Sequence, residues 1–422
     1  MQPAVAYAAL AVTVGLAVTR PRLRAGFRVT PGVAAIAGVL ALVVARMLTA
    51  SMMLDAARVQ WRPLVTLTSI MILTGVVQEV GAFDRLAAAI ERRARARSAA
   101  SAFTAVFALA VVTPALLNND AAILILTPLV VALTRRLYPR RPEITIAFAF
   151  AVFLAPGVAP FIVSNPMNMI VAEYAGLGFN AYAKVMVPLS LFGAALTYGV
   201  LRTLYRRVLR SAGEAAPAPR TVIHRHPGER LAVALMLAVL VAYPIAASLG
   251  IEIWTVAVAG AAASLAVCRA YQIAPLRKAV SHVSFDILAF LWGIFLVVQG
   301  LRSVGVVDQL RALYAAAPAG GGRLATIGVT SALGSAVIDN HPMSILNMLA
   351  VDASHGPAPL LAALVGGDLG PRLLPIGSLA GLLWIDLLRR SGVEIGLVRF
   401  VRLGTLVLLP TLAMSLALLW LA

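Results

Sequence analysis

Apolar runs and short arginine-rich stretches alternate along the whole chain. The runs are about 20 residues long, the length that an α-helix needs to cross a bilayer core of roughly 30 Å. This pattern predicts membrane-spanning helices, with the arginine clusters between them in the cytoplasm. The predicted spans lie at about 3–19, 31–50, 63–82, 182–206, 229–249, 252–268, 283–302 and 396–420, and an amphipathic interfacial helix is expected at 84–97.

Two further apolar stretches, at about 101–134 and 324–353, are interrupted by polar residues. An ionisable residue at that depth is costly in hydrocarbon, so these positions are expected to face a protein-lined cavity. Each stretch is predicted to form a helical hairpin with a polar turn. The residues at the turns are Asn118, Asn119 and Asp120 in the first hairpin and Asp339, Asn340 and His341 in the second.

Charge counting leaves one alternative open for the first hairpin. Its outer ends are both basic, with Arg97 before it and Arg135 and Arg136 after it, so both are predicted to be cytoplasmic. A re-entrant hairpin satisfies this requirement, and so do two full spans with the turn outside. We favour the re-entrant hairpin, because a turn of this polarity is better used at depth, where it lines a cavity.

Proline and glycine interrupt one more span in each half, at about 143–176 and 358–388. Backbone groups that are freed in mid-membrane can be satisfied only by a cavity or by neighbouring protein. We therefore expect one broken helix in each half, and we expect both to line the same cavity as the hairpin turns.

The two halves show signs of an internal repeat, since EVGAFDRL at 79–86 is echoed by SVGVVDQL at 303–310. The predicted fold is an all-α polytopic membrane protein with ten transmembrane helices plus two re-entrant helical hairpins. It contains two inverted repeats, at 1–206 and 229–422, joined by a cytoplasmic linker at 207–228. An odd number of crossings in each half produces the inversion, and both termini are then periplasmic.

Composition narrows the class of function. Hydrophobic residues make up 61% and charged residues 12% of the 422, with a mean hydropathy of +0.92, so no soluble catalytic domain is expected. The net charge of +18 would suggest nucleic acid in a soluble protein, but the positive-inside rule explains arginines in short loops better. One cysteine, Cys268, excludes internal disulfides and a cysteine-rich metal cluster. The sequence predicts no enzyme, no metal site, no cofactor and no nucleic-acid partner.

Asn119 and Asn340 occupy matching places in the two hairpins. A primary amide offers two donors and two acceptor lone pairs, which suits a small hydroxylated solute. Asparagine is also a preferred helix N-cap, and both roles are compatible. The candidate substrate-binding residues are Asn118, Asn119, Ser164, Asn165, Asn168, Asn340, Gly377 and Ser378.

Several ionisable residues are candidates for proton coupling. Desolvation favours the protonated form of a carboxylate such as Asp120 or Asp339, although amides of a half-helix could instead hold it charged. His341 titrates in a useful pH window, or it is a structural, hydrogen-bonded histidine. Asp368 and Arg372 form either a fixed buried ion pair or a pair that opens on protonation.

Specific motifs resemble a known family. NDAAILILTP at 119–128, GDLGP at 367–371 and LPIGSLA at 374–380, with shorter matches at 162–165, 176–179, 185–188 and 383–384, resemble the arsenite efflux permeases (ArsB type) of the ion transporter superfamily. The resemblance implies alternating-access export of trivalent arsenic and antimony hydroxides in exchange for protons across a bacterial inner membrane. It also implies an arsenical-pump ATPase as a candidate partner. The chain departs from the family at its second turn, 339–342, and at Gly367, where a cysteine is frequent.

The residues are compatible with this implied substrate. Arsenious acid is a neutral trihydroxide, so a cavity of amides and hydroxyls suits it, and one cysteine is too few to capture As(III) through thiolates. The leading alternatives are a sodium/proton antiporter or a silicic acid exporter on the same scaffold. A channel matches inverted broken helices poorly, and an enzyme would need a catalytic constellation that the sequence does not contain.

Overall fold

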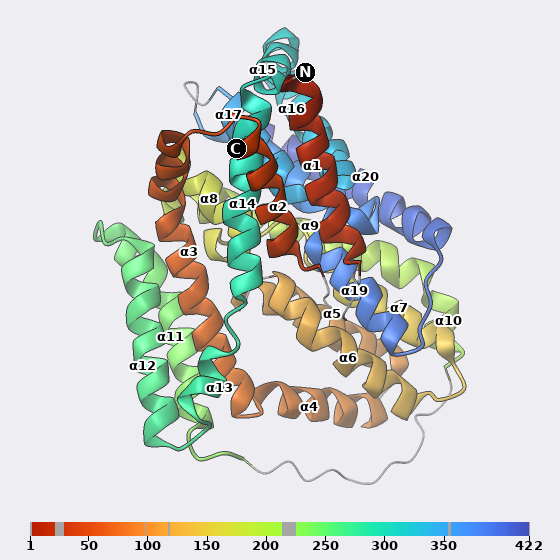
Figure 1. The fold of residues 1–422 in the computed structure, drawn as a ribbon. Coiled ribbons are helices and arrows are strands. Elements are labelled where there is room, and N and C mark those ends of the chain that lie inside the picture. The colour runs from red at the N-terminus through yellow and green to blue at the C-terminus, as the bar shows by residue number, and fades with distance from the viewer. Residues whose placement is uncertain are drawn as a thin grey trace.

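The computed structural model describes residues 2–21, 29–96, 98–116, 119–212, 225–352 and 356–421. Within these ranges every regular element is a helix. Figure 1 shows the arrangement, and the all-α membrane fold expected from the sequence is confirmed.

The first half begins with two antiparallel helices and continues with a long helix, a hairpin and a broken helix. Its elements are α1 (Gln2–Thr19), α2 (Pro31–Val44), α3 (Ala50–Glu79), α4 (Ala82–Ala96), α5 (Ala99–Leu116), α6 (Asn119–Leu137), α7 (Pro142–Leu154), η2 (Ile162–Ser164), α8 (Pro166–Tyr174), α9 (Phe179–Leu204) and α10 (Arg206–Arg210).

The second half follows a similar order of elements, with the short helix α13 (Leu276–Val280) inserted before its long third helix. They are α11 (Glu229–Ser248), α12 (Ile253–Ala270), α13 (Leu276–Val280), α14 (Phe285–Arg302), α15 (Val306–Ala316), α16 (Gly321–Ile338), α17 (Asn340–Ala350), α18 (Ala358–Leu369), η3 (Gly370–Arg372), η4 (Pro375–Gly377), α19 (Leu379–Arg390) and α20 (Leu397–Leu421).

Helices of the two halves pack in matching pairs. α2 packs against α14 and α12 against α3, while α6 packs against α19 and α17 against α8. The last long helices of the halves, α9 and α20, pack against each other. The helices that precede the two hairpins, α4 and α15, lie at opposite ends of the molecule, and both chain termini lie towards the α15 end (Figure 1).

The buried apolar residues form two separate clusters. One is centred on α3, α14, α17 and α18, and the other on α5 to α7, α19 and the first part of α20. Both broken helices contribute to both clusters, because α7 and α19 belong to the second cluster while α8 and α18 belong to the first. The interruptions in these helices therefore lie where the clusters meet.

The structure corrects the prediction between residues 45 and 62. The sequence predicted spans at 31–50 and 63–82, with a weakly charged segment around Asp55 and Arg58 between them, but α2 ends at Val44 and α3 is continuous from Ala50. Arg46 has a positive φ of 59°, which ends the helix, and the Thr49 hydroxyl accepts a hydrogen bond from the Met52 amide at the start of the next. Asp55 and Arg58 form an exposed ion pair on the helix surface, so neither charge requires a loop.

Among the described residues, five helical segments are long and apolar enough to cross a membrane by length and composition alone: Phe179–Leu204, Glu229–Ser248, Ile253–Ala270, Leu276–Arg302 and Leu397–Leu421. Others, such as α2 and α7, are apolar but shorter. The ten crossings, the repeat boundaries and the re-entrant hairpins therefore stay predictions. The expected amphipathic segment at 84–97 is helical in α4, which runs from Ala82 to Ala96, and residue 97 lies outside the described part of the chain.

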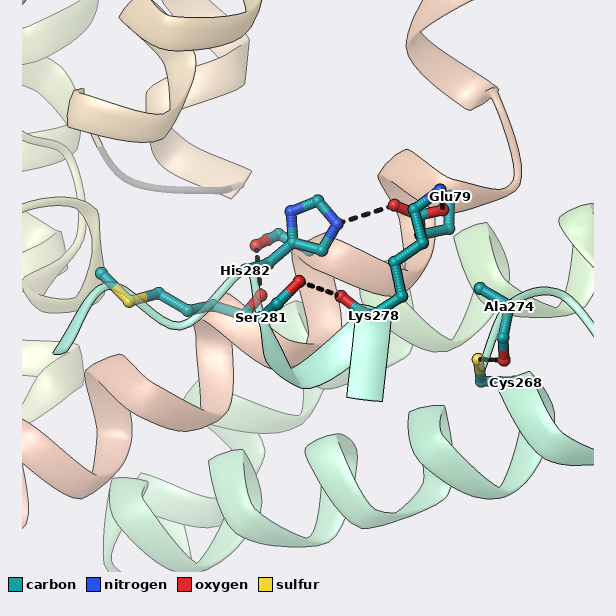
Figure 2. A network of polar contacts seen from close by, with 8 residues as sticks. Glu79, Cys268, Ala274, Lys278, Ser281 and His282 are labelled. Atoms are coloured by element: carbon teal, nitrogen blue, oxygen red, sulfur yellow. Dashed lines mark hydrogen bonds and ion pairs between the residues drawn. The ribbon is translucent and has the colours of Figure 1, made fainter. Parts of the chain in front are cut away.

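A polar network fastens the end of α3 to α13 (Figure 2). The Glu79 carboxylate accepts hydrogen bonds from Lys278 Nζ at 2.6 Å and His282 Nε2 at 2.9 Å. Beside this network the buried Cys268 thiol donates to the Ala274 carbonyl at 3.4 Å. The single cysteine is thus part of the α12–α13 connection (Figure 2).

Candidate functional site

A buried cavity lies where four helices begin. Asn119 and Asn340 are the first residues of α6 and α17, and Asn165 and Ser378 are the N-caps of α8 and α19. All four residues line the same cavity. Helix N-termini present unsatisfied N–H groups and the positive end of the helix dipole, so this cavity favours oxygen-rich solutes.

The cavity is small. Its volume is about 40 Å³. One water needs roughly 10–15 Å³ of cavity space, so the cavity has room for a few waters or for one small solute. Its lining residues are Val111, Pro114, Asn119, Phe153, Ala155, Pro156, Gly157, Val158, Ala159, Pro160, Ser164, Asn165, Ser190, Asn340, Asp368, Pro371, Arg372 and Ser378.

The structure brings most of the predicted site residues together. Asn119, Ser164, Asn165, Asn340, Ser378, Asp368 and Arg372 all line the cavity. Asn168 lies behind this lining, hydrogen-bonded to Asp368. Asn118 and the side chain of Asp120 lie outside the described part of the chain.

Asp368 connects the second broken helix to the first. Its carboxylate accepts hydrogen bonds from the Ala159 amide at 2.9 Å, Asn165 Nδ2 at 2.7 Å and Asn168 Nδ2 at 3.3 Å. All three donors belong to the interrupted segment between α7 and α8 or to α8 itself. The charge is therefore held by neutral dipoles from the other half of the protein.

Arg372 is also held by the first half. Its Nη2 donates to the Leu154 carbonyl at 2.6 Å and to the Pro156 carbonyl at 3.3 Å, and its Nη1 donates to Thr411 Oγ1 at 3.1 Å. Among the described residues, no salt bridge within 4.0 Å joins it to Asp368. The i,i+4 spacing does not produce a direct pair, because α18 ends at Leu369 and the chain turns through η3.

Several buried polar atoms at this site have no hydrogen-bond partner among the residues that the structure describes. They are Ser164 Oγ, Asn168 Oδ1, Asn340 Oδ1 and Arg372 Nε. Buried polar groups in proteins are almost always hydrogen-bonded, to water or ligand where not to protein. The group contains both donors and acceptors, which matches a solute that carries hydroxyl groups.

Asp339 and His341 do not line the cavity. Asp339 has a φ of 79°, a conformation that costs a non-glycine residue roughly 1–3 kcal/mol. Its carboxylate caps α17 by accepting a hydrogen bond from the His341 amide at 2.9 Å. The same oxygen also contacts His341 Nδ1 at 2.7 Å. The His341 ring packs edge-on against Phe290. This geometry favours the structural interpretation of both residues.

Tyr182 was missed by the sequence analysis. Its hydroxyl donates to the Ala159 carbonyl at 2.9 Å and accepts from Asn168 Nδ2 at 2.6 Å. Tyr182 therefore positions two of the residues that donate hydrogen bonds to Asp368. It lies on α9, within an ordinary apolar helix. No local motif marks it, and only the tertiary fold reveals its role.

Gly377 is also absent from the cavity lining, and the structure gives it a packing role. A Cβ added at this position would lie 2.9 Å from Pro371 Cα, 2.9 Å from the Ser335 carbonyl oxygen and 3.0 Å from Ala336 Cα. These are backbone atoms, which cannot rotate away. The glycine therefore lets the second broken helix approach α16 closely.

Gly377→Ala is accordingly expected to reduce the free energy of unfolding by about 1–3 kcal/mol, the usual effect of overpacking. Thermal unfolding of the detergent-solubilised protein measures this. Gly199→Ala is the matched control, since a Cβ there meets nothing within 4 Å. An unchanged melting temperature for Gly377→Ala would contradict the close approach.

A polar cavity at the interrupted helices of a helical membrane protein is characteristic of secondary transporters. The chain matches the family model described as "Arsenical pump membrane protein" (ArsB) over residues 9–422. It belongs to this family and is a membrane transporter connected with arsenicals.

Individual relatives agree. The chain is 30% identical over 369 residues to the arsenical pump membrane protein of Yersinia enterocolitica, covering 85% of this chain and 86% of the relative. It is 31% identical over 370 residues to that of Escherichia coli, with the same coverage. Among solved structures, the Alcanivorax borkumensis YdaH transporter matches with a TM-score of 0.60 at 16% identity, covering 99% of this chain and 96% of that one. The last match supports the fold alone.

Proposed function

We propose that this protein exports arsenite and antimonite from the cytoplasm, as neutral trihydroxides, in exchange for protons. The observation that carries the proposal is the convergence of four helix N-termini on one buried cavity with unpartnered polar atoms. Family membership supplies the class of substrate.

The cavity suits a solute that is bound through its hydroxyl groups better than one that is captured by thiolates. Arsenious acid offers three hydroxyls that both donate and accept, and the unpartnered atoms of Ser164, Asn340 and Arg372 provide both complements. Cys268 is bonded within the α12–α13 connection and does not line the cavity. Weak polar binding also allows release, which a carrier requires.

Asp368 is the strongest candidate for proton coupling. It is the only carboxylate among the described residues that line the cavity. Protonation would remove the negative charge that holds the Ala159, Asn165 and Asn168 donors, and the two broken helices could then separate. Asp120, Asp339 and His341 remain secondary candidates.

Alternating access is supported by the architecture. The matched packing pairs and the placement of α4 and α15 at opposite ends (Figure 1) fit two repeats inverted in the membrane. The arginine clusters of the loops favour the α4 end as cytoplasmic, which puts both termini in the periplasm of a bacterial inner membrane. An arsenical-pump ATPase would then reach the protein from the α4 end.

The test is As(III) uptake by everted membrane vesicles driven by a proton gradient. Asn340→Ala is expected to raise the KM about five- to thirtyfold, since a lost hydrogen bond to substrate costs roughly 1–2 kcal/mol. Protein stability should change little, because Asn340 Oδ1 has no hydrogen-bond partner in the described part of the chain. Asn180→Ala, which removes an exposed amide bonded to Pro244, is the control.

Other outcomes would identify the alternatives. Sodium-dependent proton flux without As(III) uptake would indicate a sodium/proton antiporter. Uptake of silicic acid in preference to As(III) would indicate a silicic acid exporter. A leak that ignores the proton gradient would indicate a channel. A wild-type KM for Asn340→Ala would show that this cavity is not the substrate-binding site.

A further inference from the structure

A second, larger cavity lies on the other side of the first broken helix. Its volume is about 380 Å³. Ile162, Met169 and Ala172 form one wall, while Ser164 and Asn165 of the same segment face the central cavity. The segment that holds Asp368 is therefore the partition between the two cavities. We call the larger one the outer chamber.

The outer chamber is bounded by two connections, 176–178 and 250–252. Both fall at helix ends remote from the arginine clusters, and the positive-inside rule assigns them to the periplasmic side. Glycines at these connections leave open space, since a Cβ added at Gly176, Gly178 or Gly250 meets no atom within 4 Å.

An ordered charge network crosses the rim of the chamber. Arg62 on α3 contacts Glu173 at 3.0 Å and Glu252 at 3.1 Å. The Trp254 indole N–H donates to the other oxygen of Glu252, and Trp61 and Trp254 pack with ring centroids 5.3 Å apart. Arg62 thus ties together α3, the end of α8 and the α11–α12 connection.

Part-exposed ion pairs contribute little to stability, typically about 0–1 kcal/mol. The side chains of Arg62, Glu173 and Glu252 are 40%, 36% and 46% exposed. The network therefore adds little to the fold, but it offers both donors and acceptors to a hydroxylated solute. It also fastens the far end of α8, whose beginning holds Asp368 through Asn165 and Asn168.

We propose that the outer chamber is a second solute-binding compartment on the transport path, which a neutral trihydroxide occupies after it leaves the central cavity. The inference rests on the proposed function. The Arg62–Glu173–Glu252 network lines this compartment and binds the solute hydroxyls. Movement of the 162–169 partition connects the two cavities.

Filling the chamber tests the proposal. Gly178 lines it and has an ordinary φ of −66°, so Gly178→Leu places a side chain in open space without backbone strain. We expect the maximal rate of As(III) uptake by everted vesicles to fall about tenfold, equivalent to about 1.4 kcal/mol on the limiting step. Protection of the purified protein against thermal unfolding by As(III) should persist, because the central cavity is untouched.

The control is Gly199→Leu, which also enters open space but lies on the exposed face of α9. It should transport at the wild-type rate. A wild-type rate for Gly178→Leu would overturn the proposal. Failure of the wild-type protein to move As(III) would instead overturn the proposed function.

Thiol labelling gives an independent measurement. In a Cys268→Ser background, Gly178→Cys should react with a membrane-impermeant thiol reagent added from the periplasmic side, and labelling should block export. As(III) should slow the reaction. A cysteine that reacts only from the cytoplasmic side, or whose labelling leaves export intact, would remove the chamber from the path.

Discussion

Asp368→Asn is expected to reduce proton-driven As(III) uptake by about 100-fold or more. Hydrogen bonds to a charged group are worth roughly 1.5–3 kcal/mol each, and Asp368 accepts three of them from the first broken helix. Asparagine has a single acceptor oxygen, and its amide group would face other N–H donors. It also cannot release a proton, so a carrier that couples at this position loses its driving force.

Two measurements separate coupling from binding. Uptake driven by a pH gradient should be lost in everted vesicles, while exchange of labelled for unlabelled As(III) at equal pH should persist, because exchange needs no net proton movement. Asp55→Asn is the control, since it removes an exposed carboxylate on α3 that pairs with Arg58. Gradient-driven uptake by Asp368→Asn at the wild-type rate would transfer the coupling role to another group.

The sequence predicted which residues line the cavity better than it predicted which of them bind one another. Apolar arms around Asn119 and Asn340 are local signals, and so are the proline and glycine interruptions that contain Asn165 and Ser378. All four residues line the cavity. Local patterns identify where helices begin. Because four helix N-termini line this cavity, signals for helix starts also locate the cavity.

The partners of Asp368 and Arg372 could not be predicted in this way. Their spacing suggested a mutual pair, but each is bound to groups about 200 residues away in the chain. Tyr182 was missed for the same reason. Which dipole faces which charge depends on how the two halves pack, and an apolar pattern carries no such information.

The error at α3 had a different physical origin. The sequence placed Asp55 and Arg58 in a weakly charged segment between two predicted spans, because charged residues are rare within membrane spans. Here α3 is 30 residues long, roughly 45 Å at 1.5 Å per residue. One continuous helix therefore has room for this exposed pair as well as for the apolar residues that follow it.

Arg372→Met is expected to lower the free energy of unfolding by about 3–6 kcal/mol, because it removes two buried hydrogen bonds from a charged donor, each worth roughly 1.5–3 kcal/mol. The change leaves the Leu154 and Pro156 carbonyls without their buried donor and leaves the Asp368 charge without a nearby cation. Thermal unfolding in detergent measures the loss. Arg372→Lys should lie between wild type and Arg372→Met, because a single ammonium cannot reproduce the planar fork of donors.

The double variant Asp368→Asn/Arg372→Met decides how the two charges interact. No salt bridge joins them in the described residues, so any coupling acts across space through the cavity. If it does, removing both charges should be less destabilising than the sum of the two single changes by about 1–3 kcal/mol. Strict additivity would show that each charge is stabilised only by its own dipoles, and protonation of Asp368 would then leave Arg372 in place. A measured coupling would mean that a proton entering the cavity loosens both attachments between the halves, which is what a proton-driven change of access requires.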